Sequence, residues 1–373
     1  MIRGHNLSAW KALLCLLFTL SLSFITVAQE SKIKWDTIES PSLEGNLIGD
    51  PATRPFAVYL PPSYETSDKL YPVVYALHPY GADSGTSMIS LCIPYNKSPM
   101  DSMIKNDQIG EMIIILVDGT NRFCGSWYRS SEVIGDYEGY ITKDLIDYVD
   151  SNYRTIAHRR SRGITGHSMG GTGSMYLALK YPEVFSVVVA SSGIYHHDSD
   201  FGKSYIKQAA SSNPKDWGEF APCPNAPGAF AYLAAVCPNP DKPPFFLDKP
   251  YEEIDGKIQE VPDVMERWIS AGIVDSELEQ YLKQPVRLDA IKFVHGRSDG
   301  YVPVAQARDL DQAMNDLGID HVYVEHGGGH EPLPAEGLQF LSDYLSFELP
   351  ATTTVEWQGK LSITWGKMKR ACE

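Results

Sequence analysis

One stretch, residues 160–180, constrains the fold of this chain most tightly. Residues 166–170 read Gly-His-Ser-Met-Gly. They match the Gly-x-Ser-x-Gly pattern of a nucleophile elbow, in which a serine lies on a sharp turn between a strand and a helix. Residues 162–165 read as the end of a buried strand, and the residues from Met169 onward read as a helix whose glycines permit close approach to a sheet. The stretch therefore predicts a strand, a turn that presents Ser168, and a helix; a glycine-rich turn with a bystander serine is the alternative.

Nearly continuous apolar runs elsewhere predict strands that are buried on both faces of a sheet. These runs are residues 71–77 (YPVVYAL), 111–117 (EMIIILV), 184–190 (VFSVVVA), 290–295 and 321–325. Segments with helical character alternate with them, at residues 137–152, 305–317 and 336–347, with a mixed helix and loop segment at 88–109. The alternation predicts an α/β fold with a mostly parallel central sheet and helices on both faces. Residues 33–47 and 54–60 are expected to form an antiparallel edge at the N-terminal end of this sheet.

One long segment, residues 191–288, interrupts this alternation. It is rich in proline and aromatic residues and contains one expected helix, residues 263–271. Loops of this length are usually functional, so we expect a lid or a substrate-binding wall. The expected organisation is a signal peptide at 1–28, one domain at 29–350 that includes the irregular segment, and a C-terminal tail of open role at 351–373.

The N-terminus has the layout of a secretory signal peptide. Basic residues precede an apolar run at residues 12–28, and residues 26–28 (Thr-Val-Ala) supply small side chains for cleavage before Gln29. The run is short for a membrane-spanning helix, and an uncleaved anchor is the alternative. Cys15 lies inside the run rather than just after it, which argues against a lipoprotein signal. We therefore expect a secreted or periplasmic protein without membrane attachment after cleavage.

Charge and motif content exclude several classes of partner. The formal net charge of −15 argues against nucleic acid, because nucleic-acid binding calls for a basic face. The same charge disfavours binding to an anionic membrane surface. No Cys-x-x-Cys or His-rich spacing is present, so the sequence predicts neither a metal nor a cofactor. It leaves the oligomeric state open.

Five cysteines follow the predicted signal peptide. They are Cys92, Cys124, Cys223, Cys237 and Cys372. An odd number leaves at least one thiol unpaired in an oxidising compartment. Cys223 and Cys237 flank a loop that contains proline and glycine, and we predict a disulfide between them.

Three groups that can act together follow predicted strands in the order serine, acid, histidine. Ser168 follows the strand of the elbow, Asp299 follows residues 290–295, and His330 follows residues 321–325. In open parallel sheets, ligands bind at the carboxyl ends of the strands. A serine hydroxyl needs a base to remove its proton, and the imidazole of that base needs a carboxylate to fix its tautomer and stabilise its cation. We therefore predict a catalytic triad of these three residues.

Other histidines and carboxylates near these strands are expected to have structural roles. His326 lies where its strand ends and is expected to pack or bond locally, and His295 is expected to satisfy a backbone group. Asp289 precedes its strand and so lies at the wrong end of the sheet. Residues 196–200 (HHDSD) are interpreted as a polar loop near the pocket rather than a metal site, because adjacent side chains rarely point at one ion.

Four segments together resemble the esterase family of α/β-hydrolases, which includes S-formylglutathione hydrolase (esterase D), feruloyl and acetylxylan esterases, enterochelin esterases and the antigen 85 type of mycolyltransferase. The matching segments are VYLPPSYETSDKLYPVVYALH, DGTNRFCGSWYRSSEVIGDYEGYITKDLIDYVDSNYRTI, RGITGHSMGGTGSMYLALKYPEVF, and HGRSDGYVP with GGGH. They cover most of residues 56–347. The resemblance implies the α/β-hydrolase fold and the same triad. Because known members are either cytosolic thioesterases or exported esterases, the signal peptide favours the exported group.

The resemblance also implies an oxyanion hole made by two backbone N–H groups, one after the first buried strand and one after the nucleophile. These are expected to be the N–H groups of Tyr80 and Met169. The chain departs from the family pattern here, because residues 78–81 read His-Pro-Tyr-Gly where His-Gly-x-Gly is usual. Pro79 has no N–H to donate, so the first donor is expected at Tyr80.

The expected function is hydrolysis of a small-molecule or carbohydrate-linked carboxylic ester by an exported serine esterase, through an acyl-enzyme. An acyltransferase differs only in whether water or an alcohol accepts the acyl group, and the sequence leaves this open. A catalytically silent binding protein would tend to lose members of the triad, and all three are present. A peptidase is disfavoured because the sequence contains no propeller and no acidic cluster that would recognise an amine. Fold alone would not separate these functions.

Overall fold

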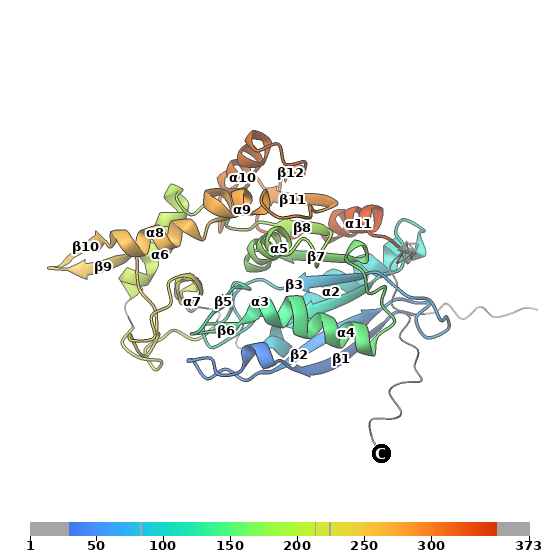
Figure 1. The fold of residues 1–373 in the computed structure, drawn as a ribbon, viewed down its shortest axis with the longest axis horizontal. Helices are drawn as coiled ribbons and strands as arrows, with labels where there is room; N and C mark the ends of the chain where they lie inside the picture. The colour runs from blue at the N-terminus through green and yellow to red at the C-terminus, as the bar shows by residue number, and fades with distance from the viewer. Residues whose placement is uncertain (1–29, 83, 213, 224, 349–373) are drawn as a thin grey trace, which may run out of the picture.

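An eight-stranded sheet forms the centre of the computed structural model, which describes residues 30–82, 84–212, 214–223 and 225–348 (Figure 1). Its strands follow the order β1-β2-β4-β3-β7-β8-β11-β12. The pairs β1·β2 and β2·β4 are antiparallel, and all later pairs are parallel. The predicted mostly parallel sheet with an antiparallel N-terminal edge is confirmed.

The bounds of the elements are as follows. The central strands are β1 (Lys32–Glu39), β2 (Thr53–Leu60), β3 (Val73–Leu77), β4 (Ile113–Val117), β7 (Arg162–His167), β8 (Val187–Ser191), β11 (Ala290–Gly296) and β12 (Val322–His326). Two short hairpins pair β5 (Ser130–Ser131) with β6 (Gly135–Asp136) and β9 (Tyr251–Ile254) with β10 (Lys257–Glu260). The α-helices are α2 (Gly85–Lys105), α3 (Tyr137–Gly139), α4 (Leu145–Asn152), α5 (Met169–Lys180), α6 (Asp200–Ser212), α7 (Gly228–Val236), α8 (Pro262–Ser270), α9 (Leu278–Tyr281), α10 (Ala305–Asp316) and α11 (Pro334–Tyr344).

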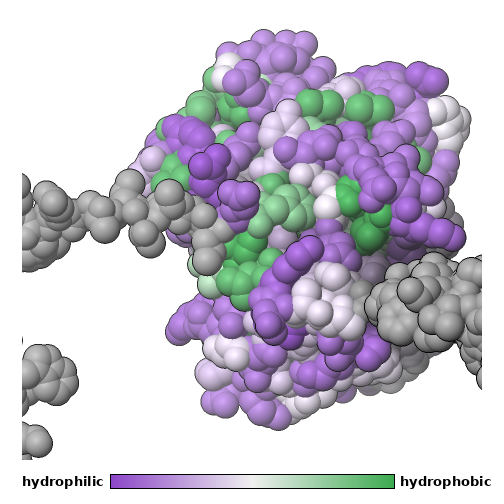
Figure 2. All heavy atoms as spheres, turned by 90° about the vertical axis from the view of Figure 1, so that its right-hand side faces the viewer, coloured by the Kyte–Doolittle hydropathy of each residue, from purple (hydrophilic) through white to green (hydrophobic). Residues whose placement is uncertain are grey.

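Helices cover both faces of the sheet. Helices α2 and α11 pack on one face, where they meet Val74 and Ala76 of β3. Helices α4, α5 and α10 pack on the other face, where Val73 and Tyr75 of the same strand point. Strands β3 and β4 are buried along their whole length, as expected for strands covered on both sides. Figure 2 shows the end of the molecule on the right of Figure 1, where apolar side chains gather between polar ones.

Two strand boundaries differ from the expected ones because local turns compete with the sheet. Strand β1 ends at Glu39 rather than continuing to residue 47, and Pro41 opens a 3₁₀ turn. Strand β8 begins at Val187 rather than at residue 184. The N–H groups of Val184 and Phe185 instead bond to the carbonyl of Tyr181, which forms a turn.

The segment expected to mix helix and loop, residues 88–109, is mainly one helix, α2, despite two prolines inside it. Pro94 and Pro99 lack the N–H that a helix interior uses, so their presence argues against a continuous helix. Tertiary packing overrides this local preference, because Ile89, Met100 and Met103 of α2 are buried against the sheet.

The expectation that residues 191–288 are irregular apart from one helix is wrong. The segment forms α6, α7, α8 and α9 and the β9–β10 hairpin, and it extends from the sheet at the left of Figure 1. Its aromatic residues pack into the main core rather than lining loops. Trp268 of α8, for example, is fully buried and stacks on His197 with ring centroids 3.8 Å apart.

The predicted disulfide between Cys223 and Cys237 is wrong. Cys223 bonds to Cys124, with Cα atoms 5.8 Å apart, and thereby ties the segment between α6 and α7 to the loop after β4. Cys237 is a buried free thiol at the end of α7, where its sulfur lies 3.8 Å from the carbonyl of Val264. Cys92 is also free. Cys372 lies outside the described residues.

The predicted signal peptide (1–28) and C-terminal tail (351–373) also lie outside the described residues. Among the helices of the described ranges, none has the length and apolar character needed to cross a bilayer.

Candidate active site

The backbone at Ser168 has the strained conformation of a nucleophile elbow. Its φ of 57° and ψ of −116° are rare for a residue with a side chain, and such strain persists only where the surroundings enforce it. The Ser168 N–H donates to the carbonyl of Ser191 at 2.8 Å, which fixes the turn to the neighbouring strand β8. A side chain on Gly166 would collide with the backbone of Gly170, and one on Gly171 would collide with Ser191. The glycines therefore permit the turn that presents Ser168.

Asp299 and His330 lie together at the carboxyl end of the sheet. His330 Nδ1 is 2.6 Å from Asp299 Oδ2. Asp299 Oδ1 accepts hydrogen bonds from the N–H groups of Tyr301 and Val302, each at 2.9 Å. The Asp299 side chain is fully buried, whereas that of His330 is 15% exposed. The carboxylate is thus held rigidly against one side of the imidazole, and the ring retains access to solvent.

Asp299 is held in its ionised form. Burial acts to raise the pKa of Asp299, but the hydrogen bonds from His330, Val302 and Tyr301 outweigh burial and lower the pKa below its ordinary value. The carboxylate is therefore charged at neutral pH and can stabilise an imidazolium at His330.

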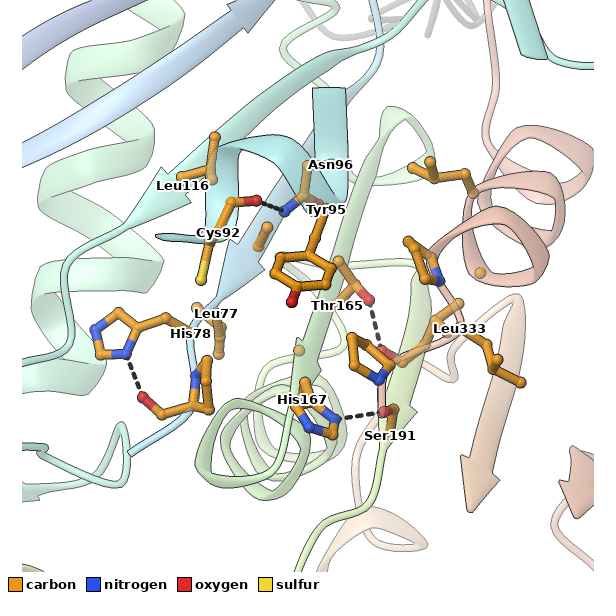
Figure 3. Close-up of a pocket in the computed structure, with 18 of the residues that line it drawn as sticks. Leu77, His78, Cys92, Tyr95, Asn96, Leu116, Thr165, His167, Ser191 and Leu333 are labelled. Atoms are coloured by element: carbon orange, nitrogen blue, oxygen red, sulfur yellow. Dashed lines mark hydrogen bonds between the residues drawn. The ribbon is translucent and has the colours of Figure 1, made fainter. Parts of the chain in front are cut away.

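His167 is a neighbour of this pair that sequence reasoning missed. Its ring centroid lies 4.6 Å from that of His330, and its Nδ1 lies 2.8 Å from Ser191 Oγ (Figure 3). Burial, together with the nearby His330, lowers the pKa of His167 to about 3. The ring therefore stays neutral at physiological pH and adds no positive charge beside His330. The position of His167 between two small residues of the elbow motif was the sequence feature that could have indicated its place in the site.

The side chains of Tyr80 and Met169, the residues expected to supply the oxyanion donors, both lie against Gly125. A side chain on Gly125 would collide with the side chains of both Met169 and Tyr80, and one on Gly170 would collide with the backbone of Leu77. The start of α5 therefore lies directly against the loop after β3.

His78 fixes the loop that carries Tyr80, a role that sequence reasoning also missed. Its Nε2 accepts a hydrogen bond from the Gly119 N–H at 2.8 Å, so Nδ1 carries the proton and donates to the Pro79 carbonyl at 2.7 Å. Burial lowers the pKa of His78, which keeps this ring neutral. The hydroxyl of Tyr128 donates to the His78 carbonyl at 2.9 Å. Tyr80 itself is anchored through its hydroxyl, which donates to the Phe123 carbonyl at 2.8 Å.

The alternative histidines have local partners. His326 Nδ1 accepts from the Gly328 N–H at 3.2 Å, and His295 Nε2 bonds to the Val302 carbonyl at 2.8 Å. His196 pairs with Asp309 at 2.7 Å. In the ranges that the structure covers, no group of three or more His, Cys, Asp or Glu side chains is arranged to hold a metal ion.

A mostly parallel sheet with a strained serine after β7, an acid after β11 and a histidine after β12 defines the α/β-hydrolase class. Within this class, the chain belongs to the esterase family, because the family model described as "Putative esterase" matches residues 51–300.

Curated relatives match part of the chain. The S-formylglutathione hydrolase of Paracoccus denitrificans is 27% identical over 190 residues, which cover 47% of this chain and 63% of that protein. An esterase of Mycobacterium tuberculosis is 31% identical over 150 residues, which cover 39% of this chain and 30% of that protein. An uncharacterized protein of Bacillus subtilis is 29% identical over 157 residues, which cover 39% of this chain and 59% of that protein. The chain thus spans less than two thirds of the length of each of these relatives.

Solved structures share the fold. A ferulic acid esterase superposes with a TM-score of 0.56 at 22% identity, covering 85% of this chain and 99% of its own. The S-formylglutathione hydrolase from Agrobacterium tumefaciens superposes with a TM-score of 0.53 at 16% identity, covering 86% of this chain and 97% of its own. Both likenesses extend over most of the chain.

Proposed function

We propose that the protein is a serine hydrolase that cleaves carboxylic esters through an acyl-enzyme. Ser168 is the nucleophile, His330 the general base and acid, and Asp299 the carboxylate that orients His330. The observation that carries this proposal is the 2.6 Å contact between His330 Nδ1 and the buried Asp299, at the sheet edge where Ser168 lies on a strained turn. The esterase names of the relatives support the same reaction.

The proposed reaction starts with the proton on His330 Nδ1, which faces Asp299 and leaves the lone pair of Nε2 free. Ser168 Oγ attacks the ester carbonyl while its proton passes to Nε2, and the carbonyl oxygen becomes an oxyanion. The N–H groups of Tyr80 and Met169 stabilise this oxyanion. The C–O bond to the alcohol then breaks, and the alcohol leaves with the proton from Nε2. Water repeats the sequence on the acyl-enzyme and releases the acid.

The substrate is proposed to be a small-molecule or carbohydrate-linked ester. One solved neighbour, the feruloyl esterase module from Clostridium thermocellum, is in complex with sinapinate, an aromatic acid. It superposes at a TM-score of 0.51 and 14% identity, so its likeness to this chain is one of fold.

Export is proposed from two independent features. Residues 1–28 have the layout of a signal peptide. The Cys124–Cys223 disulfide also suits an oxidising compartment, because cytosolic proteins keep their thiols reduced.

Replacement of the nucleophile tests the proposed reaction. Ser168→Ala is expected to lower kcat for p-nitrophenyl acetate by a factor on the order of 10⁶ while thermal unfolding stays close to that of the parent, by comparison with other triads. Turnover by a folded variant within about tenfold of the parent would exclude Ser168 as the nucleophile. Feruloyl esters, acetylated sugars and a peptide, assayed beside this ester, separate an esterase from a peptidase.

A further inference from the structure

An apolar cavity of about 420 Å³ lies beside His330, on the face of the sheet covered by α2 and α11 (Figure 3). Its volume is in the range of small-molecule binding sites. The sheet side is formed by residues such as Ala76, Thr165 and Val189, and the helix side by residues such as Ile89, Leu338 and Leu341.

The cavity adjoins the proposed reaction centre directly. His330 and His167 form part of its wall, and so does Pro79, which precedes the proposed oxyanion donor Tyr80. Ser168 directly follows His167 in the chain, so an acyl group on Ser168 would lie close to this wall. The opening to solvent lies at α2, where Leu91 and Tyr95 line the cavity although they are 64% and 59% exposed.

Three polar side chains of the wall, Thr165, Asn96 and Ser191, have partners within the protein. Thr165 Oγ1 donates to the Val189 carbonyl at 2.8 Å, and Asn96 Nδ2 donates to the Cys92 carbonyl at 3.0 Å. The hydroxyl of Ser191 is 2.8 Å from His167 Nδ1. None of the described lining residues is an Asp, Glu, Lys or Arg. A charged group in this cavity would lose its hydration without meeting a side chain of opposite charge from these four residue types, which is costly.

We propose that this cavity binds the acyl chain of the substrate, and that the substrates are esters of medium-chain aliphatic carboxylic acids. The inference rests on the proposed function. The acyl group stays on Ser168 between the two halves of the reaction, so it suits an enclosed cavity, whereas the alcohol must leave and be replaced by water in every cycle.

The parent protein is first assayed on p-nitrophenyl acetate, butyrate and octanoate, and on alkyl acetates with the extra carbons in the alcohol. The value of kcat/KM is expected to rise at least about tenfold from acetate to octanoate, since each buried methylene contributes up to about fourfold. The alkyl acetates are expected to show no comparable rise.

Two variants test the location. Ala76→Leu places extra carbon atoms inside the cavity and is expected to lower the octanoate-to-acetate ratio of kcat/KM about tenfold. Leu91→Lys places a charge at the exposed mouth, where it does not threaten folding, and is expected to lower the same ratio. Leu70→Lys changes a leucine that is 41% exposed and outside the cavity wall, and is the matched control with the parent ratio.

The outcomes separate this inference from the proposed function. If acetate is hydrolysed but chain length has no effect, or if both Ala76→Leu and Leu91→Lys keep the parent ratio, the acyl-binding role of the cavity is wrong. The proposed esterase function still stands in that case. If the rise appears in the alkyl acetates, or if methyl ferulate is the preferred substrate and is blocked by Ala76→Leu, the aliphatic acyl assignment is overturned. If no ester is hydrolysed, the proposed function itself fails.

Discussion

The geometry at His330 makes a sharp distinction between two histidines only four positions apart. His330 contacts a buried carboxylate through Nδ1, whereas His326 accepts a hydrogen bond from the local Gly328 N–H. An imidazole that acts as a base needs its second nitrogen fixed in this way. The order of residues along the chain predicts His330 as the base, and the three glycines before it would allow the ring to reach over the sheet edge.

His330→Ala is therefore expected to approach the loss of kcat seen with Ser168→Ala, on the order of 10⁶. His326→Ala is expected to keep kcat within about tenfold of the parent, because it removes only a local contact. Both variants are measured with p-nitrophenyl acetate. An equal and large loss in the two would contradict the proposed assignment of the base.

Pro79 occupies the position of the first glycine in the His-Gly-x-Gly pattern that the family resemblance implies, and its surroundings suggest why proline is tolerated there. The Pro79 carbonyl accepts a hydrogen bond from His78, which holds the turn. Proline has no N–H, and the proposed oxyanion donor of this loop is the N–H of Tyr80 instead. Pro79→Gly is expected to leave kcat within a few-fold of the parent, whereas loss of a true donor costs roughly 10² to 10³. A hundredfold increase in kcat would instead show that the native site is impaired.

The residue-level roles that sequence reasoning missed have a common physical origin. His167 and His78 are recognisable only once β7, β8 and the loop after β3 are side by side, because their partners are Ser191 and Gly119. A linear motif shows which side chain is present at a position, and it does not show which element that side chain faces.

At the scale of elements, His197 is enclosed by two helices of the long segment. It stacks on Trp268 of α8 and bonds to the Trp268 carbonyl at 2.7 Å and the Tyr232 hydroxyl at 3.0 Å. Burial, and then the charge of Arg129, lower the pKa of His197 to about 3. The unfolded chain, with a histidine pKa of about 6.5, binds more protons than the folded chain between these two values.

The contribution of His197 to stability is therefore complete above pH of about 6.5 and is lost as the pH falls towards about 3, by at most about 1.4 kcal/mol per pH unit. His197→Gln is expected to lower stability at pH 7 and to flatten the fall in the free energy of unfolding below pH 6. Urea unfolding at several pH values measures both effects. An unchanged pH slope in a folded His197→Gln variant would show that this ring does not remain neutral.

The elements that were predicted correctly from the sequence are those whose apolar residues follow the pattern that packing in or on the central sheet requires. Strands β3 and β4 are uniformly apolar, and α4, α10 and α11 carry regular spacing. Helix α2 was predicted only in part and α7 was not predicted, because Pro94 and Pro99 inside α2 and Pro227 before α7 favour loops locally. Packing against the sheet or the core decides their structure, and that packing depends on residues far away in the chain.

At the scale of the whole molecule, the Cys124–Cys223 bond connects parts of the chain separated by 99 residues. Replacing both cysteines by serine is expected to lower the free energy of unfolding by roughly 2–5 kcal/mol, because the unfolded chain gains freedom. Cys92→Ser removes a free thiol and is expected to have a much smaller effect. Chemical denaturation of the three proteins provides the comparison, and equal stability of the parent and the double variant would contradict the role of the bond.

Export has a separate readout. The protein recovered outside the cytoplasm is expected to begin at Gln29, as determined by N-terminal sequencing, and a non-reduced digest is expected to contain the Cys124–Cys223 peptide pair. Recovery of full-length chain from the cytoplasm with both thiols free would contradict export.

The span of this bond also has a consequence for how the chain acquires its structure. Cys223 and Cys237 are separated by a short loop, and closing a short loop costs less entropy than closing a long one. Cys124 and Cys223 are separated by 99 residues, so closing their loop costs more entropy until β7, α5 and β8, which lie between them in the chain, have folded. The first bond to form during oxidation is therefore expected to be the non-native Cys223–Cys237 pair. Its exchange by thiol attack would then couple completion of the disulfide to prior formation of the central sheet.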